Sequence, residues 1–277
     1  MPDKKKGFRL QTELVKIDRE QMSHHIMKRA GEILQNGGLV AFPTETVYGL
    51  GADALNEEAA QKIYAAKGRP SDNPLIVHIA DMEALGRIAE SIPKEAKTLA
   101  EAFWPGPLTM IFRKKECVPS GTTGGLSTVA VRMPSDEIAR ELIRQGGGYI
   151  AAPSANVSGR PSPTTAQHVY EDMKGRIPMI LDGGPVRIGL ESTIVDLTEE
   201  HPVILRPGYI TLSMIRSITG EAEVDRGLIA DHSTVRPKAP GMKYRHYAPR
   251  AELWIVEGPM ERVVSYINEK CSAFPGT

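Results

Sequence analysis

The stretch Lys67-Gly68-Arg69-Pro70-Ser71-Asp72-Asn73-Pro74-Leu75 joins a helical pattern to the apolar run that ends at Ile79. Gly68 and Pro70 disfavour continued helix, so the cations Lys67 and Arg69 fall in a junction between a helix and a strand. Such a junction is typical of an α/β domain, and its cations, hydroxyl and amide groups suit an anion. An isolated K-x-R is more often an ordinary polar loop, so the interpretation depends on the rest of the chain.

Helix and strand patterns alternate on both sides of this junction. Short apolar runs bounded by Gly, Pro and polar residues predict strands at 12–17, 39–42, 76–79, 109–112, 129–133, 149–152, 179–182, 192–196 and 203–206. Apolar residues at helical spacing predict helices at 19–35, 57–67, 82–89, 93–103, 135–144, 165–174, 212–219 and 260–270. We expect Asn56 and Ser91 to cap two of these helices, and residues 118–128 to form a mobile loop that acts as a lid. The fold class is therefore α/β with a mixed sheet.

Composition excludes several classes of protein. The 277 residues are 41% hydrophobic and 25% charged, which is typical of a globular protein, and the formal net charge of +0 gives no overall basic field for nucleic acid. Cys117 and Cys271 form neither a C-x-x-C pair nor a disulfide framework, so we expect a reduced, cytoplasmic protein without structural zinc. The charged start lacks the apolar stretch of a signal peptide, and no run approaches the roughly 18 apolar residues of a membrane span.

Polar residues follow several predicted strands, whereas the familiar nucleotide and hydrolase signatures are absent. The sequence contains no G-x-x-x-x-G-K-[ST], G-x-G-x-x-G, H-E-x-x-H or G-x-S-x-G. In open α/β sheets ligands bind where strand ends gather polar loops. We therefore expect a site for phosphates or a carboxylate, built from the cations Lys67, Arg69, Arg132 and Arg206 and the neutral groups of Thr44, Ser154, Asn156 and Ser192.

Two titratable residues keep alternative interpretations. His78 lies inside an apolar strand, where a core histidine and a substrate contact are about equally plausible. Glu45 is a candidate base, but a structural carboxylate at a turn fits as well. No cluster of acids predicts a metal site built by the protein, so Mg²⁺ is expected to arrive with nucleotide phosphates.

Seven ordered motifs together resemble one family. They are Pro43-Thr44-Glu45-Thr46-Val47-Tyr48-Gly49-Leu50-Gly51, Lys67-Gly68-Arg69 with Asn73-Pro74-Leu75, Trp104-Pro105-Gly106-Pro107-Leu108-Thr109, Val131-Arg132-Met133-Pro134, Ala152-Pro153-Ser154-Ala155-Asn156, Glu191-Ser192-Thr193-Ile194 and Leu205-Arg206-Pro207-Gly208. This order is similar to that of the YrdC-like threonylcarbamoyl-adenylate synthase family. The resemblance implies a twisted mixed sheet with flanking helices around a basic concave cavity.

The end of the chain resembles the longer, two-domain branch of that family. The resemblance implies a catalytic domain at 12–222, a linker at 223–250 that folds over the site, and the start of a small C-terminal α/β domain at 251–277, with a strand at 253–256. Those last residues are too few for a full domain with a core of its own, so we expect a truncated second domain.

The resemblance also implies an activity and roles for residues. L-threonine, bicarbonate and ATP would give threonylcarbamoyl-AMP and pyrophosphate, and a tRNA threonylcarbamoyl transferase would use the product. Lys67 and Arg69 would be catalytic, and L-threonine would contact Thr44, His78, Arg132 and Ser192. ATP would contact Lys67, Ser71, Ser154, Asn156, Ser162, Arg206 and Tyr247.

Two other functions stay open at this point. One is a related enzyme that adenylates a carbamoyl group for a maturation pathway, although such relatives carry zinc-finger and acylphosphatase-like parts that this chain lacks. The other is a non-catalytic RNA-binding module of the same fold, for which weak, salt-dependent RNA binding is the expected property.

Overall fold

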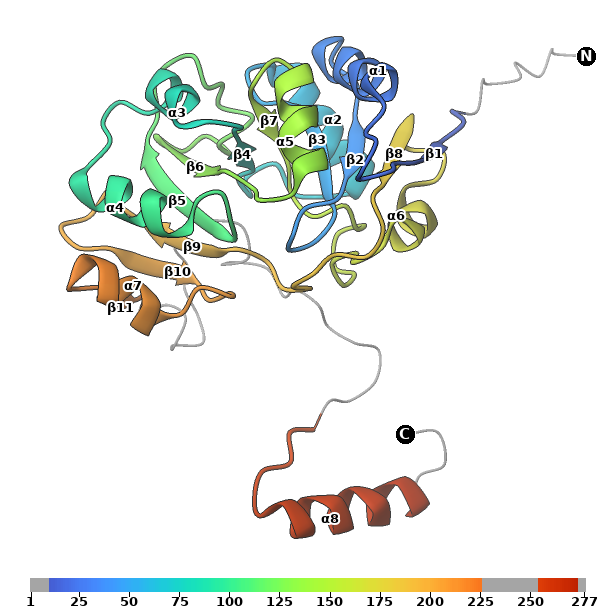
Figure 1. Cartoon of the computed structure of the whole chain (residues 1–277), viewed down its shortest axis with the longest axis vertical. Helices are drawn as coiled ribbons and strands as arrows, with labels where there is room; N and C mark the ends of the chain where they lie inside the picture. Colours follow the sequence, from blue (N-terminus) through green and yellow to red (C-terminus); the bar gives the residue numbers. More distant parts are fainter. Residues whose placement is uncertain (1–9, 226–253, 274–277) are drawn as a thin grey trace, which may run out of the picture. The chain divides into compact units, whose positions relative to one another are not determined.

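One large mixed sheet organises the described part of the chain. The computed structural model describes residues 10–225 and 254–273, and the chain divides into two compact units, Met1–Tyr247 and Ala248–Thr277. In the first unit the strands are β1 Glu13–Lys16, β2 Val40–Phe42, β3 Gly49–Asp53, β4 Ile76–His78, β5 Leu108–Arg113, β6 Thr128–Arg132, β7 Ile150–Ala151, β8 Met179–Asp182, β9 Thr193–Asp196, β10 Val203–Arg206 and β11 Glu223–Val224. Their order is β1-β8-β2-β3-β7-β4-β6-β5-β9-β10-β11, with parallel and antiparallel neighbours (Figure 1). The predicted mixed α/β class is confirmed.

Helices cover both faces of the sheet, which explains the continuous apolar runs in its strands. In β2, Val40 and Phe42 belong to one buried cluster, whereas Ala41 between them belongs to another. The cluster that contains Val40 and Phe42 includes residues of two helices that pack on each other (Figure 1). The cluster that contains Ala41 includes residues of the other helices of this unit. The neighbouring pair is α1 His24–Gln35 and α5 Glu137–Gln145; the others are α2 Glu57–Lys67, α3 Met82–Ile88, α4 Lys94–Phe103, α6 Ala166–Met173 and α7 Leu212–Thr219.

Local capping fixes where several helices begin. The side chain of Asn56, the expected N-cap of α2, accepts hydrogen bonds from the N–H groups of Glu58 and Ala59 at 3.0 and 3.2 Å. Gly68 ends α2 in the left-handed conformation, with φ of 64°. The expected cap at Ser91 is wrong, because α4 begins after Pro93 and has no side-chain cap.

Two further expectations from the sequence are corrected by the structure. The 118–128 segment is not a free lid: Val118, Thr122 and Thr123 are buried, and the Thr122 carbonyl accepts from Leu75 N–H at 2.9 Å. β3 was missed, because the two glycines on either side of Leu50, Gly49 and Gly51, resemble part of a glycine-rich loop. Gly51 lies against Phe42 and Ile150, where a Cβ would come within 2.9 Å of both side chains, so glycine serves close packing here.

The end of the chain is described only in part. Glu223 and Val224, expected in the linker, form β11 beside β10, and the rest of the expected linker, with Tyr247, lies outside the described residues. The expected strand at 253–256 is wrong for residues 254–256, which form no strand. Helix α8, Met260–Ala273, follows and has no buried residue.

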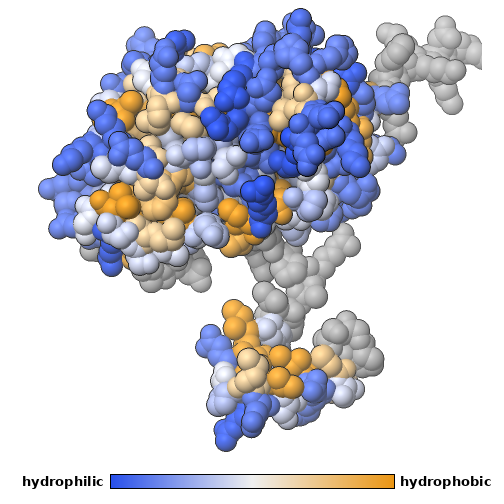
Figure 2. Space-filling view, viewed as in Figure 1, coloured by the Kyte–Doolittle hydropathy of each residue, from blue (hydrophilic) through white to orange (hydrophobic). Residues whose placement is uncertain are grey.

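Apolar side chains gather along one side of α8. Met260, Val264 and Ile267 recur at helical spacing and are exposed. Figure 2 shows hydrophobic residues gathered on one side of this helix. Across residues 10–225 and 254–273, no helix combines the length and the apolar character that crossing a membrane requires.

Candidate functional site

A cavity lies where several strands end and the motif residues meet. β4 and β6 run parallel, with His78 paired to Arg132, and Thr109 of β5 is paired to Arg132 from the other side. Leu108 is paired to Thr193, so the turn before β9 lies at the same edge. The cavity is lined by Thr44, Thr46, Val47, Gly49, Lys67, Arg69, Ile76, His78, Arg132, Ala152, Pro153, Ser154, Asn156, Ser158, Gly159, Glu191, Ser192 and Arg206.

Lys67 holds the loop that follows β7. Its side chain is 1% exposed, and Nζ donates to the carbonyl oxygens of Ser154 and Asn156, the latter at 2.5 Å. Burial, and next the charge of Arg69, lower the pKa of Lys67 well below its usual value. An ammonium group has three N–H donors and two are used here, so one remains for a ligand in the cavity.

The loop after β7 presents two polar side chains in a fixed arrangement. Ser154 Oγ donates to Asn156 Oδ1 at 2.6 Å, and Asn156 Nδ2 donates to the carbonyl oxygens of Val157 and Arg160 at 2.9 and 2.8 Å. Asp172 of α6 accepts from Val157 N–H at 2.9 Å and pairs with Arg160. The loop is therefore anchored to a helix on one side and to Lys67 on the other.

Arg69 is part of the junction that continues from α2. Its Nε and Nη2 donate to the carbonyl oxygens of Asn73 and Pro74 at 3.3 and 3.1 Å. Tyr64 supports the same turn, since its hydroxyl lies between the carbonyl oxygens of Asn73 and Gly121, at 3.2 and 2.9 Å, and shares its one proton between them. The junction is thus braced by the 118–128 segment and is not a loose polar loop.

Arg132 is a buried cation with a buried counter-ion. Its Nη2 lies 2.7 Å from Glu45 Oε1, and the two side chains are 5% and 7% exposed. The neighbouring His78 is also buried, and burial together with the charge of Arg132 lowers its pKa to about 3. His78 is therefore neutral at physiological pH, with Nδ1–H directed to the carbonyl of Ile76 at 3.1 Å.

Ser192 forms hydrogen bonds with residues of two strands, Thr109 of β5 and the cation Arg206 of β10. Its Oγ lies 2.7 Å from Thr109 Oγ1, and Arg206 Nη2 donates to Ser192 Oγ at 3.1 Å and to the Ser192 carbonyl at 2.9 Å. Thr109 is fully buried behind the cavity. A contact made by Ser192 is thus linked to the placement of Arg206.

Thr44 fixes the turn after β2. Its Oγ1 accepts from the N–H groups of Thr46 and Val47 at 3.1 and 3.3 Å and donates to the Val47 carbonyl at 2.7 Å. These contacts orient the turn beside Arg132, with Thr46 as a second hydroxyl in the cavity wall.

The structure brings together most of the residues expected from the sequence. Thr44, Lys67, Arg69, His78, Arg132, Ser154, Asn156, Ser192 and Arg206 all line the cavity. Ser71 is exposed and does not line it, and neither does Ser162, whose Oγ is buried without a partner. Tyr247 lies outside the described residues. The lining residues Thr46, Ser158 and Glu191 were missed, although each lies inside or beside one of the seven motifs.

No metal centre built by the protein is found in the part of the chain that the structure describes. Within residues 10–225 and 254–273, no group of three or more His, Cys, Asp or Glu side chains could hold a metal ion. Glu191 is the one carboxylate in the described wall of the cavity. These residues do not fit a Mg²⁺ site of their own, because a hard cation requires several oxygen ligands and the described wall offers one carboxylate.

Comparisons with protein families match two parts of the chain. Residues 32–208 match the Sua5, YciO and YrdC family model, described as "Telomere recombination". Residues 210–273 match the model described as "Threonylcarbamoyl-AMP synthase, C-terminal domain".

Similar proteins and structures point the same way. Threonylcarbamoyl-AMP synthase of Pyrococcus abyssi is 54% identical over 256 residues, which cover 92% of this chain and 75% of that protein. The Bacillus subtilis protein of the same name is 53% identical, and the match covers 87% of this chain and 69% of that protein. The crystal structure of P. abyssi Sua5 complexed with L-threonine has a TM-score of 0.90 at 53% identity, covering 95% of this chain and 76% of that one. E. coli YciO shares the fold: it has a TM-score of 0.64 at 23% identity, and the match covers 72% of this chain and 96% of that one.

Proposed function

The chain belongs to the Sua5, YciO and YrdC family, in its two-domain form, and from this membership we propose that it is an L-threonylcarbamoyladenylate synthase. The observation that carries the proposal is the cavity itself. It combines a buried arginine and hydroxyl groups suited to an amino acid with the cations Lys67, Arg69 and Arg206 suited to phosphates.

The reaction has two bond-forming steps. Bicarbonate takes up a proton and loses water to give CO₂. The amine of L-threonine attacks the carbon of CO₂, which gives a carbamate and releases a proton. A carbamate oxygen then attacks the α-phosphorus of ATP, the bond to the β-phosphate oxygen breaks, and pyrophosphate leaves. The products are threonylcarbamoyl-AMP and pyrophosphate, and ATP enters with its Mg²⁺ as a substrate.

The protein aligns the reactants and balances their charge. Thr44, His78, Arg132 and Ser192 hold L-threonine, with Arg132 at its carboxylate, and Lys67, Arg69, Ser154, Asn156 and Arg206 hold the nucleotide. Ser71, Ser162 and Tyr247 complete the nucleotide set in the same proposal. Positioned cations stabilise the negative charge that develops on the phosphate oxygens, and removing one such donor typically costs about 100-fold in rate.

The products define the partners. Threonylcarbamoyl-AMP is a reactive mixed anhydride, so a transferase that modifies an adenosine of tRNA consumes it. In the same proposal the reaction takes place in the cytoplasm. Weak RNA contact accompanies that transfer and is not the main activity.

The test is pyrophosphate release by the purified protein. We expect release from ATP only when L-threonine and bicarbonate are both present, and threonylcarbamoyl-AMP as the other product by mass spectrometry. Release that is independent of either co-substrate contradicts the proposal. Salt-dependent RNA binding without any ATP turnover would favour the RNA-binding alternative instead.

A further inference from the structure

Glu45 is a buried carboxylate that faces Arg132 from outside the cavity. It follows β2 between Thr44 and Thr46, which both line the cavity, but Glu45 itself does not. Instead it lines a second polar hollow, together with Arg19, Ser135, Asp136 and Glu137 among other residues. Arg132 thus separates the Glu45 carboxylate from the space available to a substrate.

The contact between the two side chains is an ion pair without a directional hydrogen bond. Arg132 Nη2 and Glu45 Oε1 are 2.7 Å apart, yet neither atom forms an aligned hydrogen bond. The short distance still establishes strong attraction between opposite charges in a buried setting. Arg132 Nη2 is buried against Glu45, and Nε donates to the Gly106 carbonyl at 3.4 Å, whereas Arg132 as a residue lines the cavity. A guanidinium has five N–H donors, so Arg132 keeps donor capacity for a carboxylate in the cavity.

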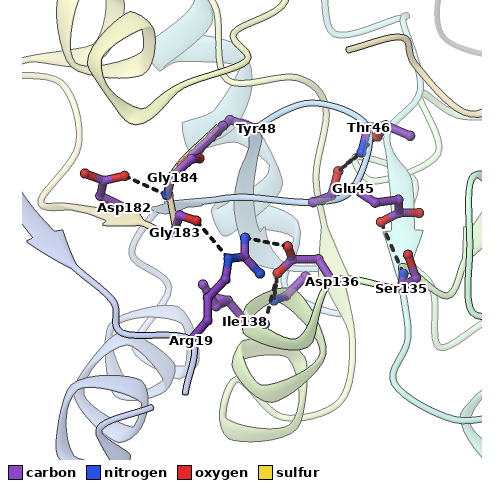
Figure 3. Close-up of polar contacts among 12 residues, drawn as sticks. Arg19, Glu45, Thr46, Tyr48, Ser135, Asp136, Ile138, Asp182, Gly183 and Gly184 are labelled. Atoms are coloured by element: carbon purple, nitrogen blue, oxygen red, sulfur yellow. Dashed lines mark hydrogen bonds and ion pairs between the residues drawn. The ribbon is translucent and has the colours of Figure 1, made fainter. Parts of the chain in front are cut away.

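The other contacts of Glu45 hold it in place. Its Oε2 accepts from Ser135 N–H at 3.1 Å, just before α5, and its main-chain carbonyl accepts from Ile188 N–H at 2.9 Å. Figure 3 shows Glu45 between Thr46 and Ser135, with the Arg19–Asp136 pair beside it. Asp136 caps α5, accepting from Ile138 and Ala139 N–H, and Arg19 also donates to the Gly183 carbonyl at 2.8 Å. The Glu45 carboxylate is therefore held by hydrogen bonds that connect the turn after β2 with the start of α5.

From this geometry we propose that Glu45 is a positioning residue that fixes the guanidinium of Arg132 for the carboxylate of the amino-acid substrate. The inference deepens the proposed function and rests on it. It also decides between the two interpretations of Glu45: both carboxylate oxygens face protein partners, and neither faces the cavity, so Glu45 does not act as the base that deprotonates the substrate amine.

The test compares Glu45→Ala and Glu45→Gln with Glu137→Gln as a matched control. Glu137 lines the same outer hollow and is exposed, so its variant makes the same charge change without touching Arg132. We expect Glu45→Ala to raise KM for L-threonine about 10- to 100-fold, the usual cost of losing a contact to a charged group. KM for ATP and kcat should stay within about threefold, and Glu137→Gln should match the wild type.

The isosteric Glu45→Gln variant keeps an acceptor for Ser135 N–H and tests the charge alone. We expect an increase in KM for L-threonine that is smaller than that of Glu45→Ala. In an Arg132→Lys background, Glu45→Gln should add little, because the two residues act as one unit. If Glu45→Ala does not fold, Glu45→Gln decides the question.

Three results would overturn the inference. They are an unchanged KM for L-threonine in Glu45→Gln, a fall in kcat with unchanged KM as expected for a lost base, or full additivity with Arg132→Lys. Failure of the proposed function is recognised separately, because wild-type protein would then release no pyrophosphate in response to L-threonine and bicarbonate.

Discussion

At the residue scale, the cavity is built from charged groups that the protein has already paired or hydrogen-bonded. Lys67 donates to two carbonyl oxygens of the loop after β7, and Arg132 is paired with Glu45. Removing one partner of such a buried group leaves the other uncompensated, which costs more than the interaction itself contributes. In the proposed function the same residues would therefore support both the local structure and the binding of substrates.

His78 gives a prediction about stability at acidic pH. Its pKa is lowered to about 3 by burial first and by Arg132 second, against about 6.5 in an unfolded chain. Between these values the unfolded state takes up a proton that the folded state excludes, so stability is retained above pH 6.5 and falls as the pH drops toward 3. The protonation of His78 in the unfolded chain should by itself lower the free energy of unfolding by about 2 kcal/mol between pH 7 and pH 5.

Denaturant unfolding of His78→Asn at both pH values measures that contribution. Asparagine retains a side-chain N–H for the Ile76 carbonyl but does not titrate. On acidification the His78→Asn protein should therefore lose about 2 kcal/mol less stability than the wild type. His25→Asn is the control, because His25 is exposed in α1. Equal pH dependence in all three proteins would contradict a neutral, buried His78.

At the element scale, the packing of α1 on α5 depends on one glycine. A Cβ at Gly31 would lie 2.4 Å from the main-chain oxygen of Gln145, the last residue of α5, so the two helices approach too closely for any side chain there. A helix is otherwise stabilised by about 1 kcal/mol when glycine is replaced by alanine. The close approach and the helix propensity thus act in opposite directions at this position.

Gly31→Ala should lower the free energy of unfolding by about 1–3 kcal/mol, because backbone must shift to accept the methyl group. Gly86→Ala is the matched control: Gly86 lies in α3 and a Cβ there meets nothing within 4 Å, so we expect a gain of up to about 1 kcal/mol. Urea unfolding of both variants measures the difference. A stabilised Gly31→Ala protein would show that α1 and α5 are less closely packed than the structure has them.

The secondary structure was largely predictable because most elements have a clear period. α7 was predicted with the bounds that the structure gives it, and the strands with continuous apolar runs were found within one or two residues. Two errors share one cause, since a local composition rich in glycine and other small residues was taken to indicate a loop. Glycine serves packing in β3, and the Gly- and Thr-rich 118–128 segment is fixed by long-range hydrogen bonds such as Thr122 to Ala54.

At the scale of the whole molecule, the sheet order creates the site. Residues from Thr44 to Arg206 meet in one cavity because β4, β6, β5 and β9 are neighbours in the sheet, in an order that differs from their order in the chain. The motifs identified most of these residues from the sequence. The pairing of Arg132 with Glu45 was not predictable from spacing, because it depends on the turn after β2 lying beside the end of β6.

A ligand held by residues this far apart in sequence stabilises the unit as a whole. Such a site does not survive in the unfolded chain, so L-threonine at 100 times its Kd should raise the free energy of unfolding by about 2.7 kcal/mol. For a unit of this size the melting temperature should then rise by about 5–10 °C. In urea the midpoint should increase with no change in the slope m, because the same surface is exposed on unfolding.

D-threonine at the same concentration is the control, since a site that fixes the carboxylate, amine and hydroxyl group together distinguishes the two enantiomers. Ser192→Ala should reduce the shift with L-threonine, because Ser192 lines the cavity and links it to Arg206. Equal shifts with both enantiomers would contradict a threonine site in this cavity. A change in m together with the midpoint would instead show that the residues of the cavity do not unfold as one unit, because the strands that carry them would then separate in more than one step.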